Sequence, residues 1–336
     1  MRAMLWTPDA EAADASVNCS LCAHACHIKE GTHGRCGVRV NRRGELITLV
    51  GDVVTSVALD PVEKKPLYHF LPGSKTFSVG SAGCNFHCRF CQNHQIAHVR
   101  PASTISGRRA TPDTLARLAA QQAPSMAFTY NEPTVFFEQI YETAGLAQAR
   151  GLKVILVSNG FMGADLLQSL NRRVNAANID LKAFSDDFYH KFCGGRLQPV
   201  LDNLKAIKKL GWWLEITTLV IPGCNDNPDE LRAMARFIRD ELGPDTPWHL
   251  SGFHGAAMMA AHPATPAFQL EDLWHMGREE GLNYVYIGNV QSLLGASTVC
   301  PSCGSVVIER RGYRTRPGKE PGVCPSCKTV LPGVWR

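Results

Sequence analysis

Three cysteines in one short stretch are the residues of this sequence best suited to do chemistry. Cys84, Cys88 and Cys91 lie in the string GCNFHCRFCQN with C-x3-C-x2-C spacing. Thiolates this close in sequence are typical ligands of an iron–sulfur cluster. Three thiolates leave one iron of a [4Fe–4S] cluster free to bind an outside molecule. The alternative is a zinc site with His87 or His94 as fourth ligand, but zinc alone does not explain the strand and helix pattern around the motif.

A second cysteine group, near the C-terminus, predicts a closed structural metal site. Its spacing is C-x2-C-x20-C-x2-C, with a proline inside each pair. The group consists of Cys300, Cys303, Cys324 and Cys327. Four thiolates complete the tetrahedral shell of Zn²⁺ and leave no open position. Such binding contributes about 10–16 kcal/mol in small peptides, enough to order a tail with almost no core. We expect zinc here, with a single rubredoxin-type iron as the alternative.

A third cysteine group, near the N-terminus, predicts another metal site, for which we favour zinc because no free coordination position is evident. It consists of Cys19, Cys22, Cys26 and Cys36. Zinc would make it a structural site, whereas an auxiliary iron–sulfur cluster would relay electrons or bind substrate. Three histidines in the same stretch offer a replacement for one cysteine. They are His24, His27 and His33.

The other cysteines, Cys193 and Cys224, stand alone, and each is expected to be an inert buried thiol. An odd total of 13 cysteines without a secretory signal argues against a disulfide framework. No apolar run approaches the roughly 20 residues that cross a bilayer. We therefore expect a cytoplasmic protein without a membrane anchor.

Short apolar runs alternate with amphipathic segments from Thr76 onward, which predicts an α/β fold with parallel strands. The expected strands are residues 76–83, 125–130, 153–160, 177–183, 212–223, 248–254 and 284–289. The expected helices are residues 112–122, 133–151, 164–173, 201–211, 228–243 and 270–281. About six such units fit a partial (β/α) barrel or an open doubly wound sheet. In both, the cysteine motif follows the first strand, at the edge where such folds place their sites.

Composition divides the chain into four expected parts. Residues 1–18 suggest a flexible polar tail, and residues 19–75 suggest a cysteine-rich unit that includes a strand at 45–50. Residues 76–297 hold the strand–helix units, and residues 298–336 form the zinc-ribbon-like module.

Strings along most of the chain resemble a known family. The sequence from Cys19 to Trp335 is similar to the radical S-adenosylmethionine (SAM) enzyme of the AmmeMemoRadiSam system, a group related to the pyruvate formate-lyase activating enzymes. The matching strings are CSLCAHACHIKEGTHGRCGVR, DPVEKKPLYHFLPGSKTFSVGSAGCNFHCRFCQN, FTYNEPTVFFE, VSNGF, IDLKAFS, LVIPGCND, YVYIGN and CPSCG…CPSC…LPGVW. The resemblance implies a partial (β/α)6 radical SAM barrel. One departure is His94, where an aromatic residue is expected, and it bears only on packing beside the cluster.

The resemblance also implies positions for SAM. Asn131 and Glu132 in TYNEPT match the Gly-Gly-Glu element that holds the methionyl ammonium group, for which a carboxylate is a suitable partner. The alternative for Glu132 is a helix N-terminal acid. Ser158 and Asn159, at the end of the third strand, are expected to bond ribose hydroxyls.

Four further polar residues on the later expected strands are candidates for the site. The aspartate that matches Asp180 lies near SAM in the activating-enzyme relatives and helps bind a monovalent cation. Lys182 belongs either to this site or to an ion pair at the barrel rim. His254 matches a histidine near the adenosine, with a structural role as the alternative. Glu215 is expected to face the barrel interior, as a SAM or substrate contact or as a structural polar group.

The resemblance implies an enzyme that reductively cleaves SAM into methionine and a 5′-deoxyadenosyl radical, which abstracts hydrogen from an unidentified substrate. It implies an electron donor such as flavodoxin or ferredoxin, and association with Memo-type and AMMECR-type proteins. One alternative is a glycyl-radical enzyme activase that acts on a partner protein. Another is a metal-stabilised RNA- or protein-binding module, under which the TYNEPT, SNG and DLK strings have no purpose.

The net charge of +5 is concentrated in the tail, where seven basic residues face only Glu309 and Glu320 after Cys300. A basic tail suits a phosphate-bearing partner such as nucleic acid. A solvated surface is the alternative.

Overall fold

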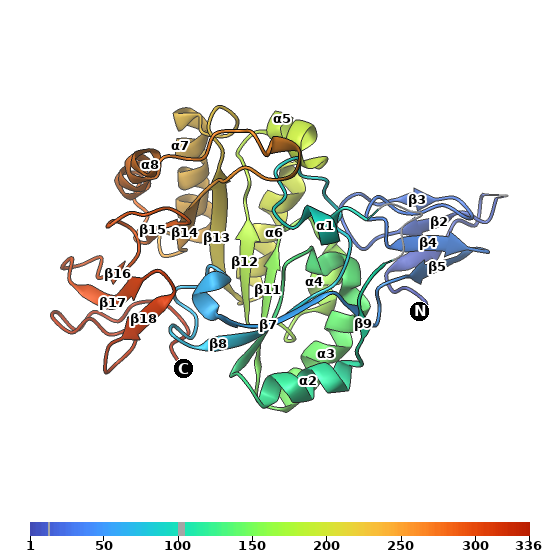
Figure 1. The fold of residues 1–336 in the computed structure, drawn as a ribbon, viewed down its shortest axis with the longest axis horizontal. Coiled ribbons are helices and arrows are strands. Elements are labelled where there is room, and N and C mark those ends of the chain that lie inside the picture. The colour runs from blue at the N-terminus through green and yellow to red at the C-terminus, as the bar shows by residue number, and fades with distance from the viewer. Residues whose placement is uncertain (13, 100–104) are drawn as a thin grey trace.

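The computed structural model describes residues 1–12, 14–99 and 105–336. Figure 1 shows three parts along the long axis: N-terminal strands at one end, a large sheet with its helices in the middle, and a small C-terminal sheet at the other end. The two outer parts carry the first and last cysteine groups.

The large sheet has the strand order β15-β14-β13-β12-β11-β10-β8-β7. Each strand expected from residue 76 onward is present and parallel to its expected neighbours, while the additional strand β7 pairs antiparallel with β8. The bounds are β7 Ser56–Pro61, β8 Lys75–Gly80, β10 Ser125–Phe128, β11 Lys153–Ser158, β12 Ala176–Asp180, β13 Trp213–Val220, β14 Trp248–Gly252 and β15 Val285–Gly288. The large sheet therefore begins before Thr76.

Helices follow the parallel strands where the amphipathic pattern predicts them, and the short helices α1 and α5 are additional. They are α1 His94–Ala97, α2 Pro112–Ala120, α3 Phe137–Ala149, α4 Ala164–Ser169, α5 Asp186–Phe188, α6 Gln198–Lys209, α7 Pro228–Phe237 and α8 Ala267–Glu279. Short 3-10 and π turns are η1 Val62–Lys64, η2 Pro133–Phe136, η3 Tyr189–Cys193, η4 Ile238–Leu242 and η5 Ala257–Met259. Thr111 and Asn227 cap α2 and α7, each followed by proline in the first turn.

The two faces of the sheet pack differently, which identifies a partial barrel rather than a doubly wound sheet. Leu214 and Ile216 on one face of β13 join the main core with the helices. The opposite face forms a separate small core. There, Ala127, Ile155 and Ala176 pack with apolar residues of the segment 62–71 and with Val334 near the C-terminus. Residues 62–71 and the C-terminal end thus close the interior, and the expected α/β partial barrel is confirmed.

A buried carboxylate holds this closing segment in place. Glu215 on β13 is fully buried and accepts the backbone N–H groups of Tyr68 and His69 at 2.9 and 2.8 Å. It also accepts the indole N–H of Trp213 at 2.9 Å and bonds His249 Nε2 at 2.6 Å. Because these partners occupy both carboxylate oxygens and the side chain is fully buried, Glu215 acts as a structural polar group.

The N-terminal part contains β1 Trp6–Pro8, β2 Val17–Cys19 and β3 His27–Ile28 in one sheet, and β4 Arg39–Arg42 with β5 Glu45–Thr48 in another. In place of the expected flexible tail, residues 1–8 are tied to this unit. Ala3 donates its N–H to Leu46, and Thr48 donates to Met1. Ala3 is buried, so apolar contact and backbone pairing together order the segment. A short pair, β6 Val53–Val54 with β9 Arg108–Arg109, lies beside it.

The C-terminal sheet contains β16 Thr298–Val299, β17 Val306–Arg311 and β18 Arg314–Pro317. His69 links the C-terminal segment after this sheet to the barrel. One of its ring nitrogens bonds the Pro332 carbonyl at 2.8 Å, and the other bonds the hydroxyl of Tyr286 on β15 at 2.6 Å. Leu71 and Val334 add a backbone hydrogen bond of 2.7 Å. Within the described ranges, no helix has the length and apolar character that spanning a membrane requires.

The Glu215 contacts generate a stability prediction. Burial would raise the pKa of Glu215, but His249 and the backbone donors hold it below the usual 4.5. Its contribution to stability is therefore fully present above the ordinary pKa of 4.5 and is lost as the pH falls through the lowered folded-state pKa. Glu215→Ala should lower the free energy of unfolding at neutral pH by about 3–5 kcal/mol, because buried donors lose their partner. Denaturant titration tests this. Exposed Glu279→Ala is the control, and equal effects of the two variants would contradict the prediction.

Candidate active site and metal centres

The cysteine loop leaves β8 and turns at Gly83, directly before Cys84. Gly83 has φ +88°, and a Cβ there would lie 2.6 Å from Val38 Cγ1 and 3.0 Å from the Cys36 carbonyl oxygen. Only glycine accepts this conformation so close to a neighbouring chain. The loop carrying the first cysteine of the motif therefore packs directly against the N-terminal cysteine unit.

One cavity of about 1760 Å³ collects the residues that the sequence singled out. The motif cysteines Cys84, Cys88 and Cys91 border it. The expected SAM residues that also border it are Asn131, Glu132, Ser158, Asn159, Asp180, Lys182 and His254. They come from the carboxyl ends of neighbouring parallel strands, because parallel strands bring these ends to one edge of the sheet.

Glu132 is the centre of a hydrogen-bond network on the β10 side of the cavity. Its Oε1 accepts the Thr134 N–H at 3.0 Å, the Thr134 hydroxyl at 2.7 Å and the Ser158 hydroxyl at 2.7 Å. Its Oε2 accepts the Asn159 N–H at 2.8 Å. Burial raises the pKa of Glu132 although these donors oppose the shift. Glu132 thus caps η2 and joins the ends of β10 and β11.

Two asparagines connect this network to the cysteine loop. Asn131 accepts the Ser81 N–H at 2.9 Å and donates to the Gly83 carbonyl at 2.9 Å. Asn159 Nδ2 lies 2.7 Å from Asn85 Oδ1 and 3.8 Å from Cys84 Sγ. The strand ends and the cysteine loop are therefore held as one unit.

An ion pair borders the cavity beside Cys88. Lys182 Nζ lies 2.8 Å from Asp180 Oδ2. Burial alone would lower the pKa of Lys182, but the charges of Asp180 and Cys88 raise it well above its ordinary value. The ammonium group of Lys182 therefore lies near the motif cysteine Cys88. His254, at the same end of the barrel, is exposed and its Nε2 contacts the Asn289 carbonyl at 2.9 Å.

Sequence reasoning missed two neighbours of this site. Cys193 in η3 is buried, and a hydrogen bond from it lowers the pKa of Cys88. Tyr130, in the quoted TYNEPT string, has φ +72° and donates its hydroxyl to Asp60 at 2.5 Å. Lys65 also bonds Asp60, at 2.8 Å. Asp60 and Lys65 lie in the string DPVEKKP and Tyr130 lies in TYNEPT, so the family strings could have pointed to this contact. No sequence pattern indicates that Cys193 lies beside Cys88.

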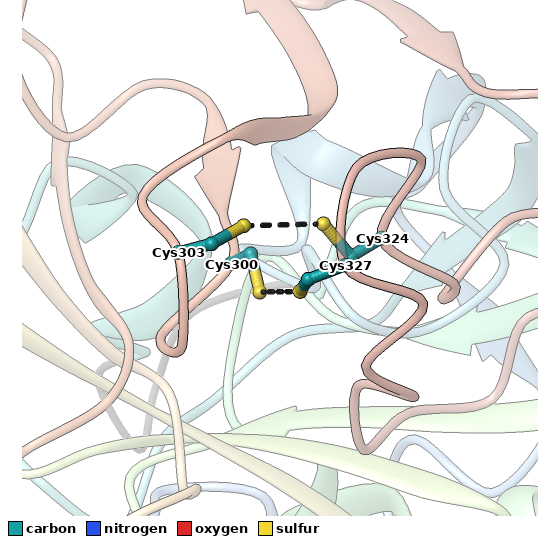
Figure 2. Close-up of side chains that lie close together, drawn as sticks. All are labelled: Cys300, Cys303, Cys324 and Cys327. Atoms are coloured by element: carbon teal, nitrogen blue, oxygen red, sulfur yellow. Dashed lines mark hydrogen bonds between the residues drawn. The ribbon is translucent and has the colours of Figure 1, made fainter.

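The tail cysteines form a compact four-sulfur group (Figure 2). Their ligand atoms all lie within 4.8 Å of one another, with Cys303–Cys324 and Cys300–Cys327 sulfur distances of 3.5 and 3.6 Å. Zinc–sulfur bonds of about 2.3 Å place tetrahedral sulfurs about 3.8 Å apart. The donor set and its spacing therefore fit one tetrahedral metal ion such as zinc.

The N-terminal cysteines lie in one unit but more widely spaced. Among the described residues, only the tail cysteines bring three or more ligand atoms within 4.8 Å. Burial raises the pKa of Cys36 to about 11, and Arg39 Nη1 lies 3.9 Å from Cys19 Sγ. His24 Nε2 contacts the Asn85 carbonyl at 2.8 Å, between the two cysteine groups.

Comparisons with known proteins show what this chain is similar to. The Radical SAM superfamily model matches residues 78–238. An uncharacterized protein of Methanocaldococcus jannaschii is 43% identical over 298 residues, 88% of this chain and 88% of that protein. The pyruvate formate-lyase-activating enzyme of Clostridium pasteurianum is 21% identical over 176 residues, 50% of this chain and 71% of that enzyme. A crystal structure of a domain of such an activating enzyme from Bacteroides vulgatus has a TM-score of 0.44 and 17% identity, and covers 49% of this chain and 99% of that domain.

The tail geometry predicts that Cys303→Ser with Cys327→Ser removes about one zinc per chain, because two ligands of a four-coordinate site are lost. Elemental analysis of the purified protein measures this. Cys224→Ser, a cysteine outside all three groups, is the matched control. The same zinc content in the tail variant and the control would refute the assignment. Point substitutions are preferable to truncation because Val334 packs in the barrel base.

Proposed function

This chain belongs to the radical SAM superfamily, and we propose that Cys84, Cys88 and Cys91 hold a [4Fe–4S] cluster at which it reductively cleaves SAM. The observation that carries the proposal is the shared cavity, which the motif cysteines border together with the expected SAM residues. As a radical SAM enzyme the protein takes electrons from a reductant, for which we propose a flavodoxin or ferredoxin.

The residues present fit such a cluster. Thiolates are the ligands that iron–sulfur clusters use, and these thiols are not drawn together as closely as the tail cysteines around a single-ion site. The Phe86 N–H points at Cys84 Sγ at 3.3 Å. Hydrogen bonds of this kind to cluster sulfurs tune the reduction potential.

When bound, the cluster supplies one electron that breaks SAM into methionine and a 5′-deoxyadenosyl radical able to abstract hydrogen. The chain's own residues bind and orient SAM. Among the described residues, Glu132 Oε2 accepts only the Asn159 N–H, so it retains acceptor capacity for the methionyl ammonium group. By the same positional argument, the ribose and adenosine would be bound by Ser158, Asn159 and His254. The ion pair of Lys182 with Asp180 would set the charge beside the cluster.

For the N-terminal cysteines we propose an auxiliary iron–sulfur cluster in place of the zinc that the sequence favoured. Among the described residues, neither this group nor the motif group brings three ligand atoms within 4.8 Å of one another, whereas the tail group does. The contact of Gly83 with Cys36 places the unit directly behind the motif loop. An auxiliary cluster there would pass electrons to the active site.

The similarity to a pyruvate formate-lyase-activating enzyme favours a second candidate, activation of a glycyl-radical enzyme. That function needs a partner protein that presents its backbone to the cavity. The strings shared with the AmmeMemoRadiSam enzymes favour instead a functional association with Memo-type and AMMECR-type proteins. Formation of a glycyl radical on a candidate partner, followed by electron paramagnetic resonance, separates the two.

Alanine at Cys84, Cys88 and Cys91 together should abolish formation of 5′-deoxyadenosine from SAM and dithionite under anaerobic conditions, because the cluster loses its protein ligands. Chromatography of the product measures this. The tail zinc should remain, and Cys224→Ala should behave as the wild type. If the triple variant still makes 5′-deoxyadenosine, the proposed function is wrong.

Glu132→Gln separates SAM binding from helix capping. Loss of a charge-assisted contact costs about 1.5–3 kcal/mol, roughly a 10- to 150-fold loss of SAM affinity. Capping alone predicts unchanged SAM affinity and a stability loss of about 1 kcal/mol. Isothermal titration and denaturation measure the two quantities. Thr134→Val is the matched control, since it removes a hydrogen bond to Oε1 but keeps the charge. Wild-type SAM affinity in Glu132→Gln would end the assignment.

A further inference from the structure

The tail module forms part of the wall of the cavity that contains the motif cysteines. Glu309, Arg310, Arg311 and Tyr313, at the β17–β18 turn, border the same cavity as Cys84. Figure 1 shows this hairpin beside the residues around η1. From η1 and its C-cap, Lys64 and Lys65 border the cavity as well. We call Lys64, Lys65, Arg310, Arg311 and Tyr313 the basic wall.

Buried polar contacts fix the hairpin against the barrel. Arg310 is 3% exposed, and its guanidinium donates to Thr298 Oγ1 at 2.7 Å and to the Tyr68 carbonyl at 2.6 Å. Glu63, 2% exposed, accepts the Thr315 hydroxyl at 2.7 Å. Such buried, charge-assisted contacts are costly to break. The basic wall is therefore a built part of the cavity rather than a loose surface loop.

The basic wall carries more positive charge than its own carboxylates neutralise. Its four cations border the cavity on the same side as two of the lining carboxylates, Glu63 and Glu309. The other lining carboxylates, Glu132 and Asp180, lie near the motif cysteines. Outside the cavity lining, one carboxylate, Asp60, serves both Lys64 and Lys65, at 3.0 and 2.8 Å. Arg310 Nε makes no hydrogen bond but lies 3.9 Å from Glu63 Oε1, and both of these side chains are buried. The side chains of Lys64 and Arg311 are 46% and 85% exposed, so a ligand can reach their charges.

We propose that the basic wall is a substrate subsite that binds an anionic group, a carboxylate or a phosphate. Guanidinium and ammonium groups donate strong hydrogen bonds to both. Tyr313, at the same turn, offers an aromatic face to the adjoining part of the substrate. The subsite deepens and rests on the proposed function, because it identifies the chemistry of the molecule presented to the radical.

The subsite also gives the tail metal a functional role. The hairpin of β17 and β18 lies in sequence between the pair Cys300–Cys303 and the pair Cys324–Cys327. One ion that binds both pairs therefore holds both ends of the hairpin. The metal would keep Arg311 and Tyr313 at the cavity, with no ligand position of its own for the substrate.

The experiment titrates inorganic pyrophosphate and, separately, citrate into the full chain that carries its cluster and zinc, by anaerobic isothermal calorimetry. Wild type is compared with Arg311→Ala, Lys64→Gln and the control Arg316→Ala. Arg316 matches Arg311 closely, since its side chain is also 85% exposed and it pairs with the same Glu309. Arg316 does not border the cavity.

We expect Arg311→Ala and Lys64→Gln each to weaken binding of at least one anion three-fold or more, with Arg316→Ala unchanged. The preferred anion then distinguishes a phosphate from a carboxylate substrate. No binding to the wild type, or equal losses in Arg311→Ala and Arg316→Ala, would overturn the subsite. SAM cleavage without substrate is measured on the wild-type preparation, so failure of the proposed function would be seen separately.

Discussion

The architecture depends on one fully buried carboxylate at the base of the barrel. Glu215 gathers two backbone N–H groups, an indole N–H and a histidine, all from segments far apart in the chain. An open half-barrel would otherwise expose apolar strand residues to water. Glu215 holds Tyr68 and His69 against β13, and residues 62–71 therefore cover these apolar strand residues. The same segment carries the contacts that position the tail module, so the base of the barrel and one wall of its cavity share a single constraint.

A second carboxylate organises the opposite end of the strands. Glu132 joins the ends of β10 and β11, while Asn131 ties them to the cysteine loop. Parallel strands bring their carboxyl ends to one edge, but side chains there must still be held at the right angle. Here the backbone N–H groups and hydroxyls around Glu132 do so. Capping and SAM binding are compatible uses of one carboxylate, because a carboxylate has about four acceptor sites.

The three cysteine groups differ in spacing, and the difference has chemical meaning. The tail sulfurs lie close enough to share one ion, whereas the motif cysteines border an open cavity. The N-terminal unit touches the motif loop at Gly83. Under the proposals made here, electron entry, radical chemistry and substrate binding would occupy successive parts of one molecule, from the N-terminal unit through the barrel to the tail hairpin.

The sequence alone determined the strands, most helices, the superfamily and the cysteine groups, because periodicity and cysteine spacing are local properties. It did not determine strand β7, the pairing of residues 1–8 or the role of Glu215, since each depends on a partner distant in the chain. Nor did it show that Arg310 and Lys64 border the cavity of Cys84. Residues 64, 84 and 310 border one cavity only because the tail folds back onto the barrel, and no local sequence pattern encodes that arrangement.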